Sequence, residues 1–378
     1  MTIATPPRDM LAAILVGDRP ALEVTRIPVP TPRAGEALVK VRACGVCHTD
    51  LHVMKGEVGF PRPAVLGHEI SGTIIAIGGG TTDARGFAAG DEVIGAFIMP
   101  CTSCAACLRD RDDLCESFFG QNRLRGTLYD GYSRLSLSDG SFLAMYSMGG
   151  LAEYCITPLA GLTRRPDQID PISGAILGCA AFTAYGAVYR AGDLRAGQSV
   201  AIVAVGGVGS SVVQLARHAG ADPVVAVDIA DDKLEAAVRL GATHAINSTR
   251  SNAAAAVREI TGGRGVDVAF EALGRPETFR QAISLLADGG RMVAVGIAAG
   301  DTAAEVEITP LVRRGYSLVG SFGARTREDL PSVVEIAAEG GFDTRGLVTR
   351  CFSLAEANQA YLALSRGEVT GRAVVVMD

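Results

Sequence analysis

The sequence lacks the features that mark nucleic-acid-binding and membrane-spanning proteins. It has no run of basic residues, and its 41 acidic side chains outnumber its 35 basic ones, which gives a net charge of −6. Because nucleic-acid surfaces bind by neutralising phosphates with lysine and arginine, this balance argues against that class of partner. No uninterrupted apolar run reaches the roughly 20 residues of a membrane-spanning helix. We therefore expect a small-molecule partner, neutral or anionic, and neither nucleic acid nor membrane.

We expect no export signal at the N-terminus of this sequence. The stretch MTIATPPRDMLAAILVGD contains a short apolar segment, but no basic region precedes it and no small-residue cleavage pattern follows. The nine cysteines, an odd number in 378 residues, fit reduced thiols and metal ligands better than a disulfide framework. We expect a cytoplasmic protein. A chain of this length with 48% hydrophobic residues is expected to form two domains.

Four of the nine cysteines lie close together, in CTSCAACLRDRDDLC. Their spacing, C-x2-C-x2-C-x7-C, suits chelation better than helical packing. Four thiolates complete a tetrahedron around zinc, and such a closed shell is structural, because no position stays open for a substrate. An iron–sulfur cluster also uses thiolates, so the spacing alone leaves both open. The four residues are Cys101, Cys104, Cys107 and Cys115.

A second metal site, with an open position, is predicted from three separated motifs. ACGVCHTDLH contains Cys47, LGHEISG contains His68 and LGCAAFTAYG contains Cys179. Two thiolates and one imidazole leave the fourth position of a zinc ion vacant, which is the arrangement of catalytic zinc sites. The alternative for a residue such as Cys179, in an apolar stretch, is an ordinary core cysteine.

Polar residues beside these ligands complete the predicted site. A ligating histidine needs its second ring nitrogen held by a carboxylate or carbonyl, and Asp50 follows Cys47 closely enough to serve. Glu69, next to the histidine, is a second candidate. Thr49 and His52 add a hydroxyl and an imidazole, which can carry a proton from a buried alcohol to solvent. The alternative interpretation of these side chains is ordinary turn polarity.

From residue 199 the sequence alternates between strand and helix patterns. SVAIVAV and PVVAVD are typical of buried strands, and GGVGSSVVQLARHAG between them is typical of a glycine turn opening a helix that ends at Gly220. Later strands are predicted in VDVAFEALG, GGRMVAVGI and YSLVGSFG, separated by helices in TFRQAISLLADGG and REDLPSVVEIAAEG. This succession predicts an α/β fold with a doubly wound parallel sheet.

The glycine turn is expected to hold a dinucleotide. Its pattern is A-x-G-x-x-G through Gly206 and Gly209, with Ala204 in place of the first glycine, where alanine is strained if its φ is positive. The helix N-terminus suits a pyrophosphate. Asp228 ends the second strand, where it can accept the adenosine ribose hydroxyls and would repel a 2′-phosphate, which favours NAD over NADP. Its alternative role is to cap the next helix.

In their order along the chain, these motifs resemble the zinc-dependent alcohol dehydrogenases of the medium-chain dehydrogenase/reductase superfamily. The resemblance covers nearly the whole chain and rests on GVCHTDLH, LGHEISG, the four-cysteine lobe, GCAAFTAYGAV, GGVGSS with VDIADDK, and GEVTGRAVV. It implies a GroES-like, mostly β catalytic domain over 1–180, with the structural-zinc lobe at about 97–120. A Rossmann NAD-binding domain follows over 181–322, and 323–378 returns to the catalytic domain.

The resemblance also implies residue roles. It makes zinc the metal at both sites, with two ions per subunit, and NAD the cofactor. Thr49 and His52 match the family's proton relay. The cofactor contacts that it implies, together with those inferred from the glycine turn and Asp228, are His48, Thr183, Gly206, Gly207, Val208, Gly209, Asp228, Lys233, Val295, Gly296, Ile297 and Arg372.

The implied reaction interconverts an alcohol and its aldehyde or ketone by hydride transfer to NAD. The matching pocket positions are apolar, which suggests a primary alcohol with a hydrophobic tail: Val58, Phe97, Met145 and Ile297. One alternative is a reductase of the same superfamily acting on a carbonyl, iminium or activated alkene. Another is a dehydrogenase for the glutathione adduct of formaldehyde. Such members anchor the conjugate with an arginine just after the lobe, where this chain has Phe119. Arg123 and Arg125 lie nearby in the sequence, so this alternative stays open.

Two further hypotheses concern the role of the cysteine lobe and the binding of NAD. The cysteine lobe could be a zinc-ribbon interaction module on an inert scaffold, or the chain could hold NAD permanently as a nicotinoprotein.

The family pairs subunits by joining their dinucleotide sheets edge to edge, so we expect a homodimer, with a tetramer as the alternative. The sequence assigns no role to Cys44, Cys155 or Cys351.

Overall fold

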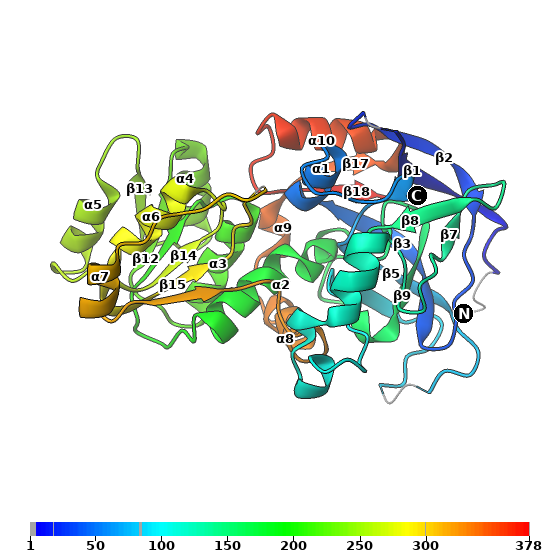
Figure 1. Ribbon diagram of the computed structural model, residues 1–378, viewed down its shortest axis with the longest axis horizontal. Helices are drawn as coiled ribbons and strands as arrows, with labels where there is room; N and C mark the ends of the chain where they lie inside the picture. The colour runs from blue at the N-terminus through cyan, green and yellow to red at the C-terminus, as the bar shows by residue number, and fades with distance from the viewer. Residues whose placement is uncertain (1–4, 18, 83–84, 299, 378) are drawn as a thin grey trace. The chain divides into compact units, whose positions relative to one another are not determined.

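The computed structural model describes residues 5–17, 19–82, 85–298 and 300–377, which fall into two compact units (Figure 1). The first unit comprises Met1–Cys179, Arg325–Ala338 and Thr344–Asp378, and the second comprises Ala180–Ala324 and Glu339–Asp343. Residues 339–343 thus group with the second unit, whereas the sequence interpretation places them in the C-terminal return.

The first unit is built mainly from short strands. They are β1 (Asp9–Leu15), β2 (Leu22–Pro28), β3 (Glu36–Val46), β4 (Ala64–Val65), β5 (Ile70–Ile77), β6 (Glu92–Gly95), β7 (Leu135–Ser136), β8 (Phe142–Met145), β9 (Tyr154–Pro158), β10 (Leu162–Arg164), β17 (Val348–Ser353) and β18 (Arg372–Val376). Its helices are α1 (His48–Met54), α8 (Thr326–Ala338), α9 (Thr344–Leu347) and α10 (Ala357–Ser365). Short 3₁₀ or π segments are η1 (Cys107–Arg109), η2 (Asp112–Leu114), η3 (Phe118–Arg123), η4 (Leu159–Gly161), η5 (Ser173–Gly178) and η7 (Leu354–Glu356).

β3 organises the larger of the two sheets in this unit. The sheet has the order β10-β6-β5-β3-β18-β17, with β9 also pairing with β3, and the smaller sheet has the order β2-β1-β4-β8-β7. β3 is antiparallel to β5, β9 and β18, and most of its side chains are buried. Ala373 of β18 lies opposite Val46, the last residue of β3. This register brings Arg372, from the far end of the chain, beside Cys47.

The second unit alternates strands and helices. Its strands are β11 (Val200–Val203), β12 (Val224–Asp228), β13 (His244–Asn247), β14 (Val266–Glu271), β15 (Leu286–Ala294) and β16 (Ser317–Gly320). Its helical segments are α2 (Ala180–Tyr185), η6 (Gly186–Ala191), α3 (Gly207–His218), α4 (Asp231–Arg239), α5 (Ala253–Ile260), α6 (Pro276–Ser284) and α7 (Ile308–Arg313).

These strands form one fully parallel sheet in the order β13-β12-β11-β14-β15-β16. β11 and β12 are buried along their whole length, as expected for central strands covered on both faces. Alternate residues such as Val203 and Val227 pack with α5 and α6 residues, including Val257 and Ala282, in one core. The strand order reverses between β11 and β14, which is the feature of a Rossmann-type sheet, so the predicted fold class is confirmed.

Two predicted helices differ from the observed ones. The helical pattern in TFRQAISLLADGG is wrong beyond Ser284, because Leu286 already lies in β15, paired with Val266 of β14. The apolar residues there serve a buried strand instead of a helix face. REDLPSVVEIAAEG does form a helix, α8, but it belongs to the first unit and does not separate strands of the parallel sheet. In the described ranges, no helix combines the length and apolar character needed to cross a membrane.

Candidate metal centres and active site

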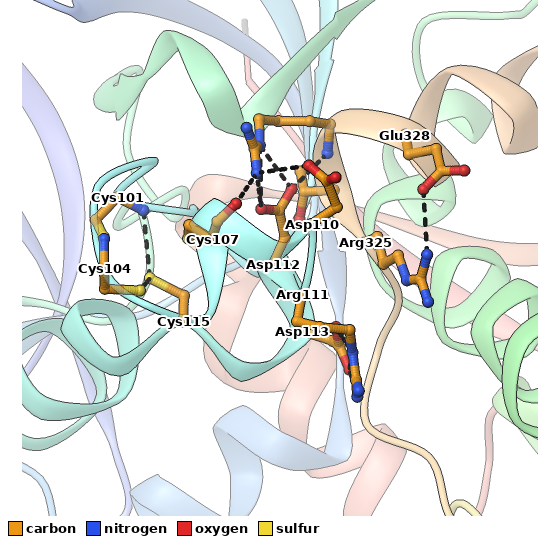
Figure 2. Close-up of polar contacts among 12 residues, drawn as sticks. Cys101, Cys104, Cys107, Asp110, Arg111, Asp112, Asp113, Cys115, Arg325 and Glu328 are labelled. Carbon is orange, nitrogen blue, oxygen red and sulfur yellow. Dashed lines mark hydrogen bonds and ion pairs between the residues drawn. The ribbon is translucent and has the colours of Figure 1, made fainter.

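The four lobe cysteines lie close enough together to bind one metal ion. Their sulfurs, one each from Cys101, Cys104, Cys107 and Cys115, all lie within 4.8 Å of one another (Figure 2). Backbone N–H groups point at these sulfurs: those of Cys101 and Phe118 donate to Cys115, and that of Cys104 donates to Cys101. Such donors favour the thiolate, which is the form that binds zinc. A four-sulfur set is complete, so this centre has no position for a substrate.

A buried ion pair fastens the lobe to the rest of its unit. Asp112, only 1% exposed, accepts hydrogen bonds from Arg327 of α8 at Nε (3.0 Å), Nη2 (2.7 Å) and the backbone N–H (2.9 Å). The same Nη2 donates to the backbone oxygen of Cys107 at 2.7 Å. Asp112 and Cys107 stand side by side in Figure 2. The ligand loop is thereby held against the C-terminal segment.

The second predicted metal group is assembled from three distant parts of the first unit. Cys47 is the N-cap of α1, His68 precedes β5, and Cys179 follows η5. Their ligand atoms, with a carboxylate oxygen of Glu69, lie within 4.8 Å of one another, and all four residues are buried. The Cys179 sulfur is 3.5 Å from His68 Nε2. Two thiolates and one imidazole suit zinc, and the set leaves room for a fourth ligand.

Asp50 orients the ligating histidine. Its Oδ1 lies 3.0 Å from His68 Nδ1 and accepts the Gly67 N–H at 3.3 Å, and its Oδ2 accepts the Tyr361 hydroxyl at 2.9 Å. With Nδ1 occupied, Nε2 is the nitrogen that faces the sulfurs. Burial alone would lower the pKa of His68, but the Asp50 carboxylate and Cys47 outweigh it and raise that pKa to about 10. A metal must therefore displace a proton from this site. The sequence did not indicate Tyr361.

Glu69 has a different place from the one predicted. It does not hold the second nitrogen of His68; its Oε1 lies 3.8 Å from Nε2, on the ligand side, and forms an ion pair with Arg372 Nη2. Its Oε2 is buried without a partner among the described residues. Burial raises the pKa of Glu69 to about 7, against the opposing effect of Arg372. Arg372, predicted to contact a cofactor phosphate, is itself buried, and its Nε has no partner in the described part of the chain.

Helix α1 carries the predicted relay from the buried site to the surface. Thr49 Oγ1 is 3.5 Å from the Cys47 sulfur. One turn later, the His52 side chain is 42% exposed, and its Nδ1 pairs with the carboxylate of Glu57. His48, a predicted cofactor contact, is exposed at the start of the same helix. The helix therefore presents its polar residues in the order that proton transfer to solvent requires.

Aromatic rings form a wall beside His68. The rings of Phe97, a predicted pocket residue, and Tyr146, which was not predicted, stand edge-on to the His68 ring, at centroid distances of 6.1 and 6.0 Å. Tyr146 directly follows the predicted Met145, which ends β8 and is fully buried. Val58, also predicted, is 40% exposed. The structure thus places Phe97 beside the candidate metal group and adds Tyr146 to it.

The glycine turn of the second unit fits an anion. Gly206 is the N-cap of the 12-residue helix α3, and a Cβ there would meet nothing within 4 Å, so open space lies in front of the helix N-terminus. Gly209 must be glycine, since a Cβ would come within 2.0 Å of the Ala204 oxygen. Gly207 and Val208 form the first turn of the helix. Unpaired N–H groups at such a terminus suit a pyrophosphate.

Ala204 occupies the strained position that its place in the motif suggests. Its φ is +70°, the left-handed region that costs a residue other than glycine roughly 1–2 kcal/mol. The hydrogen bond from its N–H to the Val227 oxygen, at 2.8 Å, ties it to β12. The turn thus keeps its shape without the first glycine.

Asp228 holds the glycine turn and the turn that follows β12 together through hydrogen bonds. Its Oδ2 accepts the Val205 N–H at 2.9 Å, and its Oδ1 accepts the Ile229 and Ala230 N–H groups at 2.7 and 3.1 Å. It therefore fixes the loop that follows β11 and the loop that follows β12, without capping α4, whose N-cap is Ala230. A carboxylate accepts about four hydrogen bonds, so these contacts leave capacity for a ribose hydroxyl.

The remaining predicted cofactor residues lie in the second unit. The N–H groups of Val295 and Gly296 both donate to the backbone oxygen of Glu271, which ends β14 and was not singled out from the sequence. Strands β11, β12, β14 and β15 end on the same edge of the sheet, where Rossmann folds bind their ligand. Ile297 follows there and is 59% exposed. Thr183 lies on α2 and Lys233 on α4.

Known proteins resemble both units. Residues 33–167 match the family model described as alcohol dehydrogenase GroES-like domain, and 207–339 match that described as zinc-binding dehydrogenase. An alcohol dehydrogenase from Geobacillus stearothermophilus is 33% identical over 369 residues, which cover 97% of this chain and 98% of that protein.

Two crystal structures share the fold over nearly their full length. An alcohol dehydrogenase zinc-binding domain protein from Burkholderia ambifaria has a TM-score of 0.92 at 34% identity, covering 98% of this chain and 99% of its own. Benzyl alcohol dehydrogenase from Acinetobacter calcoaceticus has a TM-score of 0.90 at 30% identity, covering 98% and 100%.

Proposed function

The chain belongs to the zinc-dependent alcohol dehydrogenase family, and we propose that it is an NAD-linked enzyme that oxidises primary alcohols with a hydrophobic body to aldehydes, and runs in reverse. The observation that carries this proposal is the buried set of Cys47, His68 and Cys179, with Asp50 behind the histidine. This set has the ligand types and the vacancy of a catalytic zinc site. The lobe, with four sulfurs, has no such vacancy.

A zinc ion held by these three residues would polarise the substrate oxygen as a Lewis acid and make loss of the alcohol proton easier near neutral pH. Thr49, whose hydroxyl lies beside the Cys47 sulfur, would take that proton. His52 lies one turn further along α1, with its ring exposed, and would deliver the proton to water.

The surroundings of the site favour an open fourth position. Glu69 is near enough to be a ligand, but its Oε1 is paired with Arg372, which offsets the charge of the carboxylate and would compete with a metal for that oxygen. Phe97 and Tyr146 supply apolar surface beside His68 and limit access of water. A substrate oxygen would therefore compete mainly with a water molecule for the fourth position.

The second unit would hold the hydride acceptor. NAD, the cofactor that we propose, would receive the hydride from the carbinol carbon. The N-terminus of α3 would bind its pyrophosphate, and the Asp228 carboxylate would accept the adenosine ribose hydroxyls while repelling a 2′-phosphate. We expect preference for NAD over NADP on this ground.

The test is NADH formation on primary alcohols by the wild type, Thr49→Ala and Thr49→Ser. We expect Thr49→Ala to lower kcat by about 10²–10⁴, because a positioned proton acceptor contributes that much, and Thr49→Ser to retain most of the activity. Unchanged alcohol oxidation by Thr49→Ala would show that Thr49 does not accept the alcohol proton. No NAD-linked oxidation of any alcohol by the zinc-loaded wild type would overturn the function and favour a reductase of another substrate class.

A further inference from the structure

The aromatic wall beside His68 contains an arginine whose charge has no partner among the residues that the structure describes. Arg123 ends η3, and its guanidinium carbon lies 4.0 Å from the centroid of the Tyr146 ring, 5.5 Å from that of Phe118 and 5.9 Å from that of Phe97. Within the described ranges no carboxylate pairs with Arg123, and its Nη1 is buried without a hydrogen-bond partner. The guanidinium therefore lies among rings and not among acceptors.

This guanidinium is close to the open metal group. Tyr146 and Phe97, over which it lies, are the two rings that stand edge-on to His68. The guanidinium carbon lies 4.0 Å from the centroid of the Tyr146 ring, and that centroid lies 6.0 Å from the centroid of the His68 ring. The guanidinium is therefore a near neighbour of the His68 ring.

The support of Arg123 is rigid. The preceding residue, Asn122, is fully buried, and its side-chain amide donates to the backbone oxygens of Thr127, Met145 and Ser147. Two of these acceptors flank Tyr146 along the chain. The same amide therefore fixes the base of the arginine to the segment that carries the ring beneath it, which presents the guanidinium in a set position before any ligand binds.

Ring contacts satisfy only part of what a guanidinium needs. An aromatic face attracts the cation, but the five N–H donors lie in the guanidinium plane and form hydrogen bonds at its edge. A buried donor without a partner is destabilising, because it has lost its hydrogen bonds to water and gained none in the protein. A carboxylate is the acceptor whose geometry matches the guanidinium edge, through two parallel charge-assisted hydrogen bonds.

We propose that Arg123 binds a carboxylate of the substrate, so that the preferred alcohols and aldehydes carry an acid group separated from the reacting oxygen by a flat apolar body. This inference rests on the proposed function and narrows its substrate class. The rings of Phe97 and Tyr146 contact the apolar body, His68 and its partner ligands mark the reacting end, and Arg123 marks the acidic end. Arg123 is then a specificity-determining residue.

The experiment compares two substrates of the same shape, para-hydroxymethylbenzoate and para-hydroxymethylbenzamide, with NAD. The variants are Arg123→Met, Arg123→Lys and Arg125→Met; the last removes the same charge two residues away, at an exposed position. In the wild type we expect kcat/KM for the benzoate to exceed that for the benzamide by about 10-fold or more, the worth of a charge-assisted hydrogen bond. Arg123→Met should abolish this ratio and leave the benzamide rate within about threefold, and Arg123→Lys should keep part of it. Arg125→Met should keep the ratio.

Calorimetric binding of para-hydroxymethylbenzoate to the zinc-loaded protein provides a readout that does not depend on turnover. Loss of this binding in Arg123→Met, with binding retained in Arg125→Met, supports the proposal. Equal rates on both substrates by the wild type, or an equal loss on both in Arg123→Met, would overturn it, since the arginine would then only support the rings. Carboxylate binding that depends on Arg123, but without oxidation of either alcohol, would overturn the proposed function and not the carboxylate site.

Discussion

The two cysteine-containing groups of the first unit bring together four candidate ligands each, yet they are built in opposite ways. The lobe takes all of its sulfurs from one loop, and backbone N–H groups orient them. The buried group takes Cys47, His68 and Cys179 from three separate segments, and side chains orient them. A site made by one loop can form with little help from the fold, whereas the buried site exists only when the sheet around β3 is complete.

This difference in construction indicates different roles for the two groups. The lobe's neighbours are backbone amides and the Asp112–Arg327 pair, which stabilise a loop and contact no substrate. The neighbours of the buried group are titratable or polar side chains, namely Asp50, Glu69 and Thr49, which can hold or move protons. Changes in the buried group should therefore alter turnover, and changes in the lobe should alter stability.

The largest expected effect is that of removing a ligand from the buried group. Cys47→Ala should lower kcat/KM on alcohols by about 10³ or more, because Lewis-acid catalysis by a metal contributes several kcal/mol and each 1.4 kcal/mol is tenfold. Steady-state NADH formation measures this. Cys351→Ala, which removes an exposed cysteine outside both groups, is the control and should match the wild type. Near-wild-type turnover by Cys47→Ala would erase the distinction between the two groups.

A smaller loss of zinc affinity and activity is expected from replacing Asp50, which holds His68. Asp50→Asn keeps the shape but removes the charge that holds His68 Nδ1, and such changes cost about 10–100-fold in metal affinity or activity. Tyr361→Phe removes one hydrogen bond to the same carboxylate, worth about 1 kcal/mol, so its loss should be no more than about fivefold. Competition against a chelator measures zinc affinity in both. A greater loss in Tyr361→Phe than in Asp50→Asn contradicts this order.

The smallest effect on turnover, with a clear effect on stability, is expected in the lobe. Asp112→Asn removes the nearer of the two carboxylates that pair with Arg327, the other being Asp110 at 3.7 Å. It should lower the free energy of unfolding by about 2 kcal/mol, less than the 3–5 kcal/mol of a fully buried pair because Arg327 is partly exposed. Thermal or urea unfolding measures it, and kcat should stay within about twofold.

Asp113→Asn is the matched control for that variant. Asp113 pairs with Arg111 in the same loop, as Figure 2 shows. Both side chains of this pair are more exposed than those of the Asp112–Arg327 pair, and such pairs contribute about 0–1 kcal/mol. Equal destabilisation by the two variants would mean that the Asp112–Arg327 pair does not anchor the lobe.

The parts of the molecule that were predicted from sequence are those with local signals. The lobe cysteines carry their spacing with them, and Asp50 lies three residues after Cys47, so one helical turn brings it to the site. The second unit repeats apolar strand and helix patterns that only a parallel sheet satisfies. Tyr361 could not be predicted, because it reaches Asp50 across 311 residues of sequence and no local pattern marks it.

Other differences arise where two neighbouring residues or two elements compete for one signal. Met145, the last residue of β8, and Tyr146, which follows it, are both large and apolar enough for a pocket, and no local pattern indicates that the Tyr146 ring lies beside His68. Leu285 and Leu286 continue the helical pattern of α6, but Leu286 pairs with Val266 of β14 and therefore begins strand β15. Glu69 is adjacent to His68 in sequence, yet the partner that fixes it is Arg372, brought there by β18.

The most direct test of the account is the zinc content per subunit, by elemental analysis, of the wild type, Cys47→Ala and Cys104→Ala. We predict two zinc ions in the wild type and one in each variant, with alcohol oxidation lost only in Cys47→Ala when activity is expressed per folded molecule. A single zinc ion in the wild type that persists in Cys47→Ala, or alcohol oxidation that follows the lobe zinc instead, would contradict the division into a closed structural centre and an open catalytic one.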